Sequence, residues 1–563
     1  MHHHLSLRSK LIIMGSVMAS LFLVALDQTI VSTALGKIVE EFNAFESLSW
    51  IVTAYLLTTT VTVPIAGKLS DLFGRRTLLL IGVAVFGLGS FQSGIAGDIN
   101  QLILFRALQG IGGGIITANA FTIVGDLFAA RERGKWQGLI GAVFGMSSVV
   151  GPLLGGWLTQ GAVIGSLTTD WRWTFFINVP IAILAFILIA IFCPALRHDR
   201  KPKIDYLGAA LLTLALATLV LAVDNTEMIF GDLLDATGLS LLGLRVIMFS
   251  IVAIATAGFI FVERKAQEPI LPLSFFKNPN FVKIMGIAAL FGSAFMGAIL
   301  YLTQFNQQVY GATPTESGLM LLPMVAGLMM TSITSGQIIS RTGRYKIFMQ
   351  VGIVLATAMI ALLTTLHPDT PYWHEGVIMF FLGAGLGVVM PVMTLAVQAE
   401  FKQHDLGAAT SSTQLFRSLG TTIGVAVFGA VLTAGLSTQI GDMSQNAYIK
   451  TLRATPAGAA IIKDPSDTNT LLNLNMHDTK QTITDKFEES IAQFPTAVQD
   501  QARDKFYAQQ QEYADKIVTA FSDSLRGIFI TSSIIMAVAA VLVFSLKEKE
   551  LPQGTPGASP GVE

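Results

Sequence analysis

A single acidic residue, Asp27, lies deep within the first long apolar stretch of the sequence. A carboxylate in hydrocarbon is costly, so it needs a partner, a water-filled cavity or a proton, and it is a functional candidate by default. Counted at about 1.5 Å per residue from Leu11, Asp27 lies about 24 Å into the membrane. The fourth apolar stretch runs the opposite way and brings Arg106 to a similar depth. We predict that Asp27 binds and releases protons beside Arg106, with a static ion pair between two helices as the alternative.

A polar loop that follows the second apolar stretch is the next candidate. Its glycines permit a close turn, and its aspartate can cap a helix N-terminus or pair with a neighbouring arginine. We therefore predict a conformational latch made of Gly67, Asp71, Gly74, Arg75 and Arg76. A degenerate second copy runs from Gly336 to Arg344, after the tenth apolar stretch, with Ser340 where the first copy has Asp71. The latch is accordingly expected to be one-sided.

Small residues gather in the fifth apolar stretch. They let helices approach closely, and a proline among them interrupts the backbone hydrogen bonds, so this segment can pack tightly and bend. The residues are Gly145, Gly151, Pro152, Gly155 and Gly156.

Polar side chains on otherwise apolar stretches are candidates for lining a substrate cavity. For each of them, hydrogen bonding between helices is an equally good interpretation. The candidates are Gln28, Tyr55, Gln109, Asn119, Gln304, Gln308 and Arg417.

The elements that must position these residues are membrane helices. The chain is 52% hydrophobic and 13% charged, whereas soluble domains are about 25% charged. Stretches of roughly 20 apolar residues predict about 14 spans. The fold class we expect is an all-α polytopic membrane protein with its spans arranged as 6+2+6, and with an extracytoplasmic helical hairpin before the last span.

The predicted boundaries follow from these stretches. They are a cytoplasmic N-terminus at 1 to 10, a six-helix bundle at 11 to 196, a linker and two extra helices at 197 to 265, five helices of a second bundle at 266 to 436, the hairpin at 437 to 521, the last span at 522 to 546 and a cytoplasmic tail at 547 to 563.

The distribution of Lys and Arg predicts the orientation. Basic residues cluster after the even-numbered spans, as in the 197 to 203 segment, and such loops stay in the cytoplasm. Both termini are therefore expected to be cytoplasmic in a multi-pass protein of the cell membrane. Histidines 2 to 4 receive no metal assignment, and the single cysteine, Cys193, gives neither a disulfide nor a cysteine-based zinc site.

Several motifs together resemble one family of transporters. The 67 to 76 loop is similar to the loop signature of the major facilitator superfamily, and the fifth-span run GPLLGG resembles the antiporter signature of that superfamily. The segments LDQTIV (26 to 31), RALQGIGGG (106 to 114), WRWTFFINVP (171 to 180) and YLTQF (301 to 305) look like those of its 14-helix drug:proton antiporters, the EmrB/QacA type. The resemblance implies multidrug efflux driven by the proton gradient without a cofactor, and hence a link to antibiotic resistance.

Three other functions stay open from sequence alone. A lipid or metabolite exporter would share every motif, an uptake symporter is disfavoured by the fifth-span run, and a non-transporting sensor is a different class. Nucleic-acid binding is set aside because the net charge of -1 offers no basic face, and no catalytic or phosphate-binding motif indicates an enzyme. We expect lipophilic or amphiphilic cargo, since spans 9 to 13 carry no mid-membrane carboxylate. We also expect a monomer, with a possible extracytoplasmic partner at 437 to 521.

Overall fold

The structure is a computed structural model of the 563-residue chain. It describes residues 6 to 551 apart from short segments at 43 to 47, 160, 162, 165 to 166, 195 to 203, 224 to 225, 441 to 442, 456 to 457, 460 to 461, 463 and 466 to 467. Histidines 2 to 4, the basic 197 to 203 linker and most of the C-terminal tail lie outside the described residues.

Helices make up nearly the whole fold. Within the described residues, fourteen of them are long and apolar enough to cross a membrane, which confirms the predicted number of spans. The first group comprises α1 (Leu7–Phe42), α2 (Leu48–Phe73), α3 (Arg75–Gly94), α4 (Ile99–Leu127), α5 (Ala130–Thr159), α6 (Trp173–Phe176) and α7 (Asn178–Phe192), with a small pair of strands, β1 (Val163–Ile164) and β2 (Leu167–Thr168), before α6. We call α1 to α7 the N-terminal helices.

Two further membrane helices follow in the chain. They are α8 (Tyr206–Val223) and α10 (Leu241–Glu263), joined by the shorter α9 (Thr226–Thr237). These two helices pack on each other, and α8 lies against α2. Most apolar residues of α10 are exposed, as expected of a helix that faces lipid, whereas α8 is largely covered. The division of the chain as 6+2+6 stays a prediction.

The second large group holds the other membrane helices. It comprises α11 (Pro279–Gln308), α13 (Leu322–Thr342), α14 (Lys346–Leu363), α15 (Tyr372–Glu400), α16 (Leu406–Ile440) and α21 (Thr496–Phe544), with the short segments η2 (Leu273–Lys277), α12 (Pro314–Met320) and η3 (Gln403–Asp405) between them. We call α11 to α16 together with α21 the C-terminal helices. A large apolar core fills this group, and a separate one lies among the N-terminal helices.

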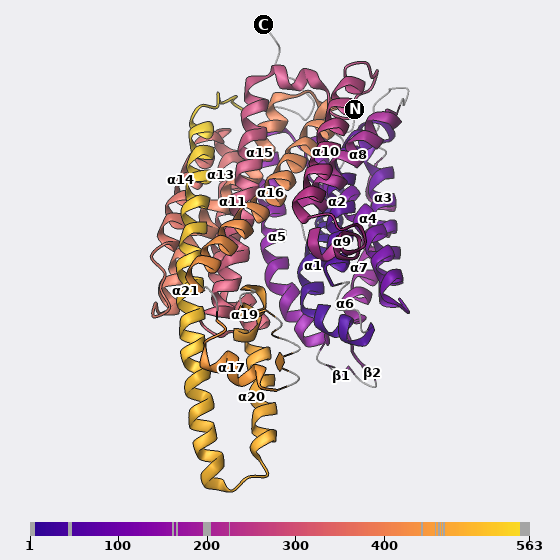
Figure 1. Ribbon diagram of the computed structural model, residues 1–563. Coiled ribbons are helices and arrows are strands. Elements are labelled where there is room, and N and C mark those ends of the chain that lie inside the picture. Colours follow the sequence, from indigo (N-terminus) through magenta and orange to yellow (C-terminus); the bar gives the residue numbers. More distant parts are fainter. Residues whose placement is uncertain are drawn as a thin grey trace.

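A helical hairpin extends from one end of the C-terminal helices (Figure 1). It contains α17 (Ala447–Arg453), α19 (Thr468–Asn475) and α20 (His477–Ile491), and its second arm is the first part of α21. The two arms turn at Pro495, as predicted, and the rings of Phe487 and Phe506 stack with their centroids 3.9 Å apart. The sequence pattern thus predicted the hairpin itself.

The two ends of the bundle differ. Helix α1 begins and α21 ends on the same side, opposite the hairpin (Figure 1), and we call these the termini side and the hairpin side. Among the described residues, the hydrogen bonds between the N-terminal and C-terminal helices gather in the half of the bundle nearer the termini side. They include Gln398 to the Phe121 carbonyl at 3.0 Å and Ser332 to the Gly138 carbonyl at 2.7 Å. The bundle is therefore closed at the termini side.

Candidate functional site

Asp27 and Arg106 form an ion pair inside the N-terminal helices. Arg106 Nη1 lies 2.5 Å from Asp27 Oδ2, and neither side chain is more than 2% exposed. Helix α1 supplies the aspartate and the antiparallel α4 supplies the arginine, so the depths estimated from the sequence bring the two together. A buried pair of this kind is stable only while both charges stay matched, because removing either partner leaves the other unpaired in the interior.

Neutral donors complete the coordination of the Asp27 carboxylate. Gln109 Nε2 donates to Asp27 Oδ1 at 2.8 Å, and the Asn178 amide approaches the same oxygen at 3.4 Å. Asn178 also donates to Ser90 Oγ at 3.1 Å, which links α7 and α3 to the site. For Gln109, cavity lining and hydrogen bonding between helices were equally good interpretations, and the side chain bonds the aspartate of the neighbouring helix. The roles of Asn178 and Ser90 were missed, although Asn178 falls in the WRWTFFINVP segment.

Arg106 has partners besides the aspartate. Its Nη1 donates to Gln109 Oε1 at 2.8 Å and its Nε to the Ile51 carbonyl at 3.2 Å. The Tyr55 ring lies 4.3 Å from the guanidinium carbon, close enough for a cation–π contact. Tyr55 is thus buried in this cluster, with its hydroxyl donating to the Val24 carbonyl at 3.3 Å, and does not face an open cavity. The guanidinium would keep several contacts if the carboxylate were neutralised.

The glycine run of α5 packs directly on α1 beside the ion pair. A methyl group at Gly151 would overlap with Thr29, and one at Gly155 with Thr33 and the Ile30 carbonyl. Thr29 Oγ1 donates to the Ser147 carbonyl at 3.1 Å. The helix thus approaches α1 more closely than side chains would allow. Pro152 lies inside α5 and faces Gly318 of α12, while Gly145 faces α13, so the same run also touches the C-terminal helices.

The far end of α1 is fixed by another charged contact. On the hairpin side, Glu41 lies 2.7 Å from Arg172 Nη2 and accepts from Trp171 Nε1 at 2.6 Å. The Arg172 hydrogen bond is the main reason that the pKa of Glu41 falls below its usual value. A lowered carboxylate pKa stabilises the folded protein above the ordinary pKa, and this contribution is lost as the pH falls through the lowered value.

The predicted latch residues meet at the termini side. Asp71 accepts hydrogen bonds from the backbone N–H groups of Gly407 at 3.2 Å and Ala408 at 3.0 Å, which open α16, and it pairs with Arg75. Arg75 is wholly buried and also lies 2.7 Å from Asp126. Both interactions considered for Asp71 are therefore present at once. The aspartate crosses from the N-terminal to the C-terminal helices and joins a helix N-terminus, where negative charge is favoured.

The glycines and the second arginine of the loop have separate positions. Gly67 touches Gly407 and Ser411, so a methyl group there would collide with α16. Gly74 has a φ of 94°, in the region that favours glycine, and connects α2 to α3. Arg76 turns away from the latch and donates to the Ala190 carbonyl at the end of α7.

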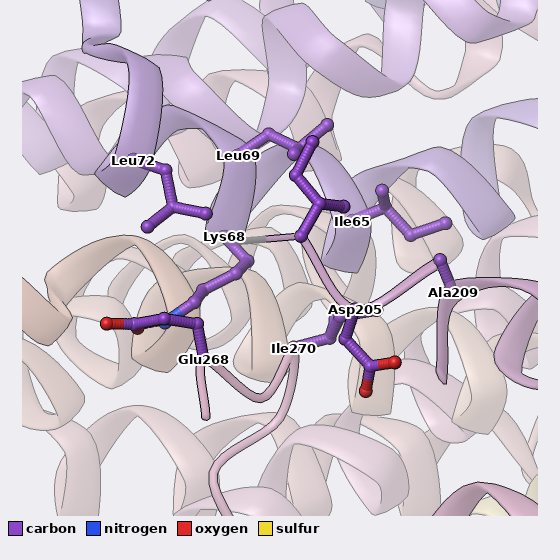
Figure 2. A pocket seen from close by; sticks show the side chains of 9 residues that line it. Ile65, Lys68, Leu69, Leu72, Asp205, Ala209, Glu268 and Ile270 are labelled. Atoms are coloured by element: carbon purple, nitrogen blue, oxygen red, sulfur yellow. Dashed lines mark hydrogen bonds and ion pairs between the residues drawn. The ribbon is translucent and has the colours of Figure 1, made fainter. Parts of the chain in front are cut away.

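Lys68, within the same loop, points to the segment that follows the two additional helices. Its Nζ lies 2.7 Å from Glu268 Oε2, and Figure 2 shows the two side chains meeting while the Asp205 carboxylate points away. Ile65, Leu69 and Ile270 line the same small pocket. Asp205 instead accepts from the Gly208 N–H at 2.7 Å, at the start of α8. The latch loop is thus also tied to the α8 and α10 pair.

The second copy of the loop has a carboxylate after all, supplied from elsewhere in the chain. Glu548, from the segment after α21, accepts from the backbone N–H groups of Tyr345 at 2.8 Å and Lys346 at 2.9 Å at the start of α14. Nearby, Arg131 of α5 donates to the Leu551 carbonyl at 2.8 Å. Ser340 stands where the first copy has its aspartate, and the contact of Glu548 was not predicted, because no local pattern joins residues 345 and 548.

We expect Glu548→Gln to destabilise the folded protein slightly. The change removes a negative charge at the N-terminus of α14, an effect of about 0.3–1 kcal/mol at exposed positions. The purified protein should therefore unfold at a lower temperature, whereas Glu550→Gln, two residues along the same exposed segment, should leave the unfolding temperature unchanged. Equal unfolding temperatures for Glu548→Gln and wild type would contradict this role.

The other residues predicted for a cavity separate into different environments. Gln28 is exposed on α1 and Gln304 is half-buried on α11. Asn119 is buried and donates to the Ile115 carbonyl of its own helix, and Arg417 bonds Gln414 one turn away. Gln308 binds the hairpin, since it donates to the Leu472 carbonyl at 3.3 Å and accepts from Asn475 at 3.1 Å. The polar groups of Gln308 thus anchor the hairpin, in line with the alternative interpretation of hydrogen bonding between helices.

Comparison with known proteins places the chain in a family. Residues 17–425 match the Major Facilitator Superfamily. The chain is 35% identical to the multidrug transporter protein MdtP of Bacillus subtilis, over 96% of this chain and 93% of that protein. It is 36% identical to multidrug resistance protein 3 of the same organism, over 77% of this chain and 81% of the relative.

A solved structure supports the fold. The human organic anion transporter MFSD10 aligns with a TM-score of 0.55 at 17% identity, over 75% of this chain and 93% of that one. At this identity the likeness concerns the fold alone. The fourteen spans and the multidrug-transporter relatives agree with the resemblance to 14-helix drug:proton antiporters. The chain is a multi-pass membrane protein that belongs to the Major Facilitator Superfamily.

Proposed function

We propose that this protein is a proton-coupled exporter of lipophilic or amphiphilic compounds, a multidrug antiporter that works by alternating access. The observation that carries the proposal is the ion pair between Asp27 and Arg106, enclosed in the N-terminal helices. An ionisable residue embedded in the membrane is a functional candidate by default, and acidic residues at such depth form proton relays in pumps and transporters. The names of the two Bacillus subtilis relatives support multidrug transport. The proton gradient is the energy source, and no cofactor enters the cycle.

The geometry supports a specific coupling step. When Asp27 takes a proton it no longer balances the charge of Arg106, which keeps Gln109, the Ile51 carbonyl and the Tyr55 ring as partners. The attraction that holds α1 to α4 then weakens. Because the glycine run of α5 packs on α1, a shift of α1 moves α5 as well. Helix α5 also bonds the C-terminal helices through Gly138 and Ser332, so the shift reaches the closed termini side.

The direction of the cycle follows from the proposed orientation. Arg75, Arg131 and Arg341 lie toward the termini side, and basic loops are retained in the cytoplasm. We infer that the termini side is cytoplasmic and that the chain acts as a monomer in the cell membrane. With that side closed, Asp27 takes a proton from outside as substrate leaves. Release of the proton to the cytoplasm resets the transporter.

An efflux assay over a panel of probes tests this function. In inverted vesicles with an acidic lumen, the wild-type protein should accumulate a neutral lipophilic dye or a lipophilic monocation, and a protonophore should abolish the accumulation. Accumulation that ignores the protonophore would refute proton coupling. The absence of exchange between labelled and unlabelled probe, for every probe that binds, would instead indicate a non-transporting sensor.

Export of a specific lipid or metabolite is the second candidate. The observation that favours it is the hairpin, which is anchored on α11 by Gln308 and Asn475 and would give a lipid a protected surface on leaving the bundle. Binding of fluorescent phospholipid compared with dyes, each measured on the same purified protein, separates the two cargoes. Tight binding of one lipid class with no dye binding would favour this candidate over multidrug export.

A further inference from the structure

A second buried carboxylate lies among the C-terminal helices. Glu375 is in the first turn of α15, which begins at Tyr372 on the hairpin side. A residue so close to a helix end would be expected to reach the membrane surface. Its side chain is nevertheless fully enclosed, with 0% of the residue exposed. Glu375 was not among the predicted site residues, because counting residues placed it at the edge of a span.

The partner of Glu375 is an amide that can serve both protonation states. The two carboxylate oxygens lie 2.9 Å and 3.1 Å from the Asn306 amide of α11, which donates to both of them when its nitrogen faces the carboxylate. With the amide reversed, its oxygen accepts a hydrogen bond from the protonated acid. Rotation of one amide therefore satisfies either form of Glu375. An aspartate or a lysine at position 306 could not do this.

The other groups around Glu375 are neutral or already engaged. The Tyr310 hydroxyl lies beside the carboxyl group and donates to the Thr370 carbonyl at 2.8 Å. On α15 itself, Tyr372 donates to the Met320 carbonyl at 2.8 Å, and the ring of His374 stacks on Trp373.

The described elements packed around this end of α15 place no cation against Glu375: Arg526 of α21 donates to the Thr364 carbonyl at 3.1 Å at the end of α14, and His367 is exposed in the loop before α15. The end of α13 that starts at Leu322 and the last turn of α14 are apolar, and Glu316 of α12 is held by Thr313. Within the described part of the chain, no basic nitrogen forms an ion pair with Glu375, although ten such pairs are resolved elsewhere.

The C-terminal helices hold a contact that can be compared with that of Asp27. In each of the two groups the first and fourth membrane helices meet through a polar contact: α1 and α4 through Asp27 and Arg106, and α11 and α15 through Asn306 and Glu375. Inverted and parallel repeats of transporters place functional groups at such related positions. A guanidinium keeps the first carboxylate ionised, whereas an amide offers only neutral hydrogen bonds. A buried carboxylate without a cation is stable chiefly when it carries a proton.

We propose that Glu375 is a second proton-binding site, which takes up a proton when water reaches the hairpin-side end of α15 and holds it while that end is enclosed. The N-terminus of α15 favours the ionised form while water is present, so the proton exchanges with the outer solution only in that state. Proton binding by Glu375 does not depend on the proposed function. Its use in transport rests on the proposed proton-coupled export, to which it would add a second coupled proton.

Infrared difference spectroscopy on the purified full-length protein tests the binding. The difference spectrum between acidic and alkaline buffer should show the C=O stretch of protonated carboxyl groups. The Glu375→Gln variant should lose one such band. Asn306→Ala should shift that band, because the hydrogen-bond partner changes. Asp369→Asn is the matched control, since Asp369 is an exposed carboxylate in the loop just before α15, and it should keep the band.

Folding does not confound the result. Glutamine at 375 has the shape of the protonated acid and can still bond Asn306, so Glu375→Gln should unfold at the wild-type temperature. A folded Glu375→Gln protein whose carboxyl bands equal those of the wild type would overturn the site. In vesicles, we expect Glu375→Gln to move fewer protons per substrate molecule than wild type, and an unchanged proton count would overturn the role in coupling. Failure of the wild type to export under any proton gradient would count against the proposed function alone and would leave the infrared result standing.

Discussion

Asp27→Asn should leave no proton-driven accumulation of substrate above that of protein-free vesicles. Asparagine fills the same space and can still accept a hydrogen bond from Arg106, but it cannot bind and release a proton. Exchange of labelled for unlabelled substrate requires no net proton movement and should continue. The loss is therefore specific to the coupled reaction, and it is measured as uptake into inverted vesicles with and without an imposed pH gradient.

A companion variant separates coupling from stability. Asp27→Asn leaves the Arg106 charge buried without a carboxylate, and breaking a buried pair in this way costs about 3–5 kcal/mol. Combining Asp27→Asn with Arg106→Gln removes both charges and should restore the unfolding temperature but not proton-driven uptake. Undiminished uptake by Asp27→Asn would refute the coupling role. Restored uptake in the double variant would show that the pair acts only as a structural contact.

The ion pair was predictable because the membrane simplifies the problem. Hydrocarbon penalises a charge so strongly that one aspartate in an apolar stretch already demands an explanation, and helix rise converts sequence position into depth. The same estimate of depth predicted that Arg106 lies beside Asp27. Neutral partners carry no such penalty, so Asn178 and Ser90 were not distinguishable from the many polar residues that pack between helices.

The features of the fold also separate into those that the sequence predicted and those that it did not. Hydropathy predicted fourteen spans, and helical spacing with Pro495 predicted the hairpin, because both are local properties of the chain. Contacts between distant segments that no membrane-embedded charge marks were not predictable from one sequence. Glu548 reaches the start of α14, and Gln308 anchors α19, through positions that only tertiary packing brings together. Glu375 was missed for a related reason. It lies only a few residues from the start of its span, and its burial comes from α11 and the segment around Tyr310.

Asp71→Asn should open the termini side of the bundle. The aspartate holds the first N–H groups of α16 and the buried Arg75, and an asparagine must place its own N–H₂ group against one of these donors. Hydrogen bonds to charged groups contribute about 1.5–3 kcal/mol each. A loss of about 2 kcal/mol shifts a two-state equilibrium about thirtyfold, so a closed state that dominates in the wild type should give way to a mixture.

Spin labels report the opening directly. Cysteines introduced at the exposed positions Glu132, at the start of α5, and Lys402, before α16, place one label on each side of the closed end, while the native Cys193 is buried. In the Asp71→Asn background the distance distribution should broaden to longer separations. Ser340→Ala is the matched control, because Ser340 occupies the corresponding place in the second loop and its hydroxyl donates to the Gln337 carbonyl of its own helix. Unchanged distances in Asp71→Asn, or equal opening in Ser340→Ala, would mean that Asp71 does not latch the two groups of helices together.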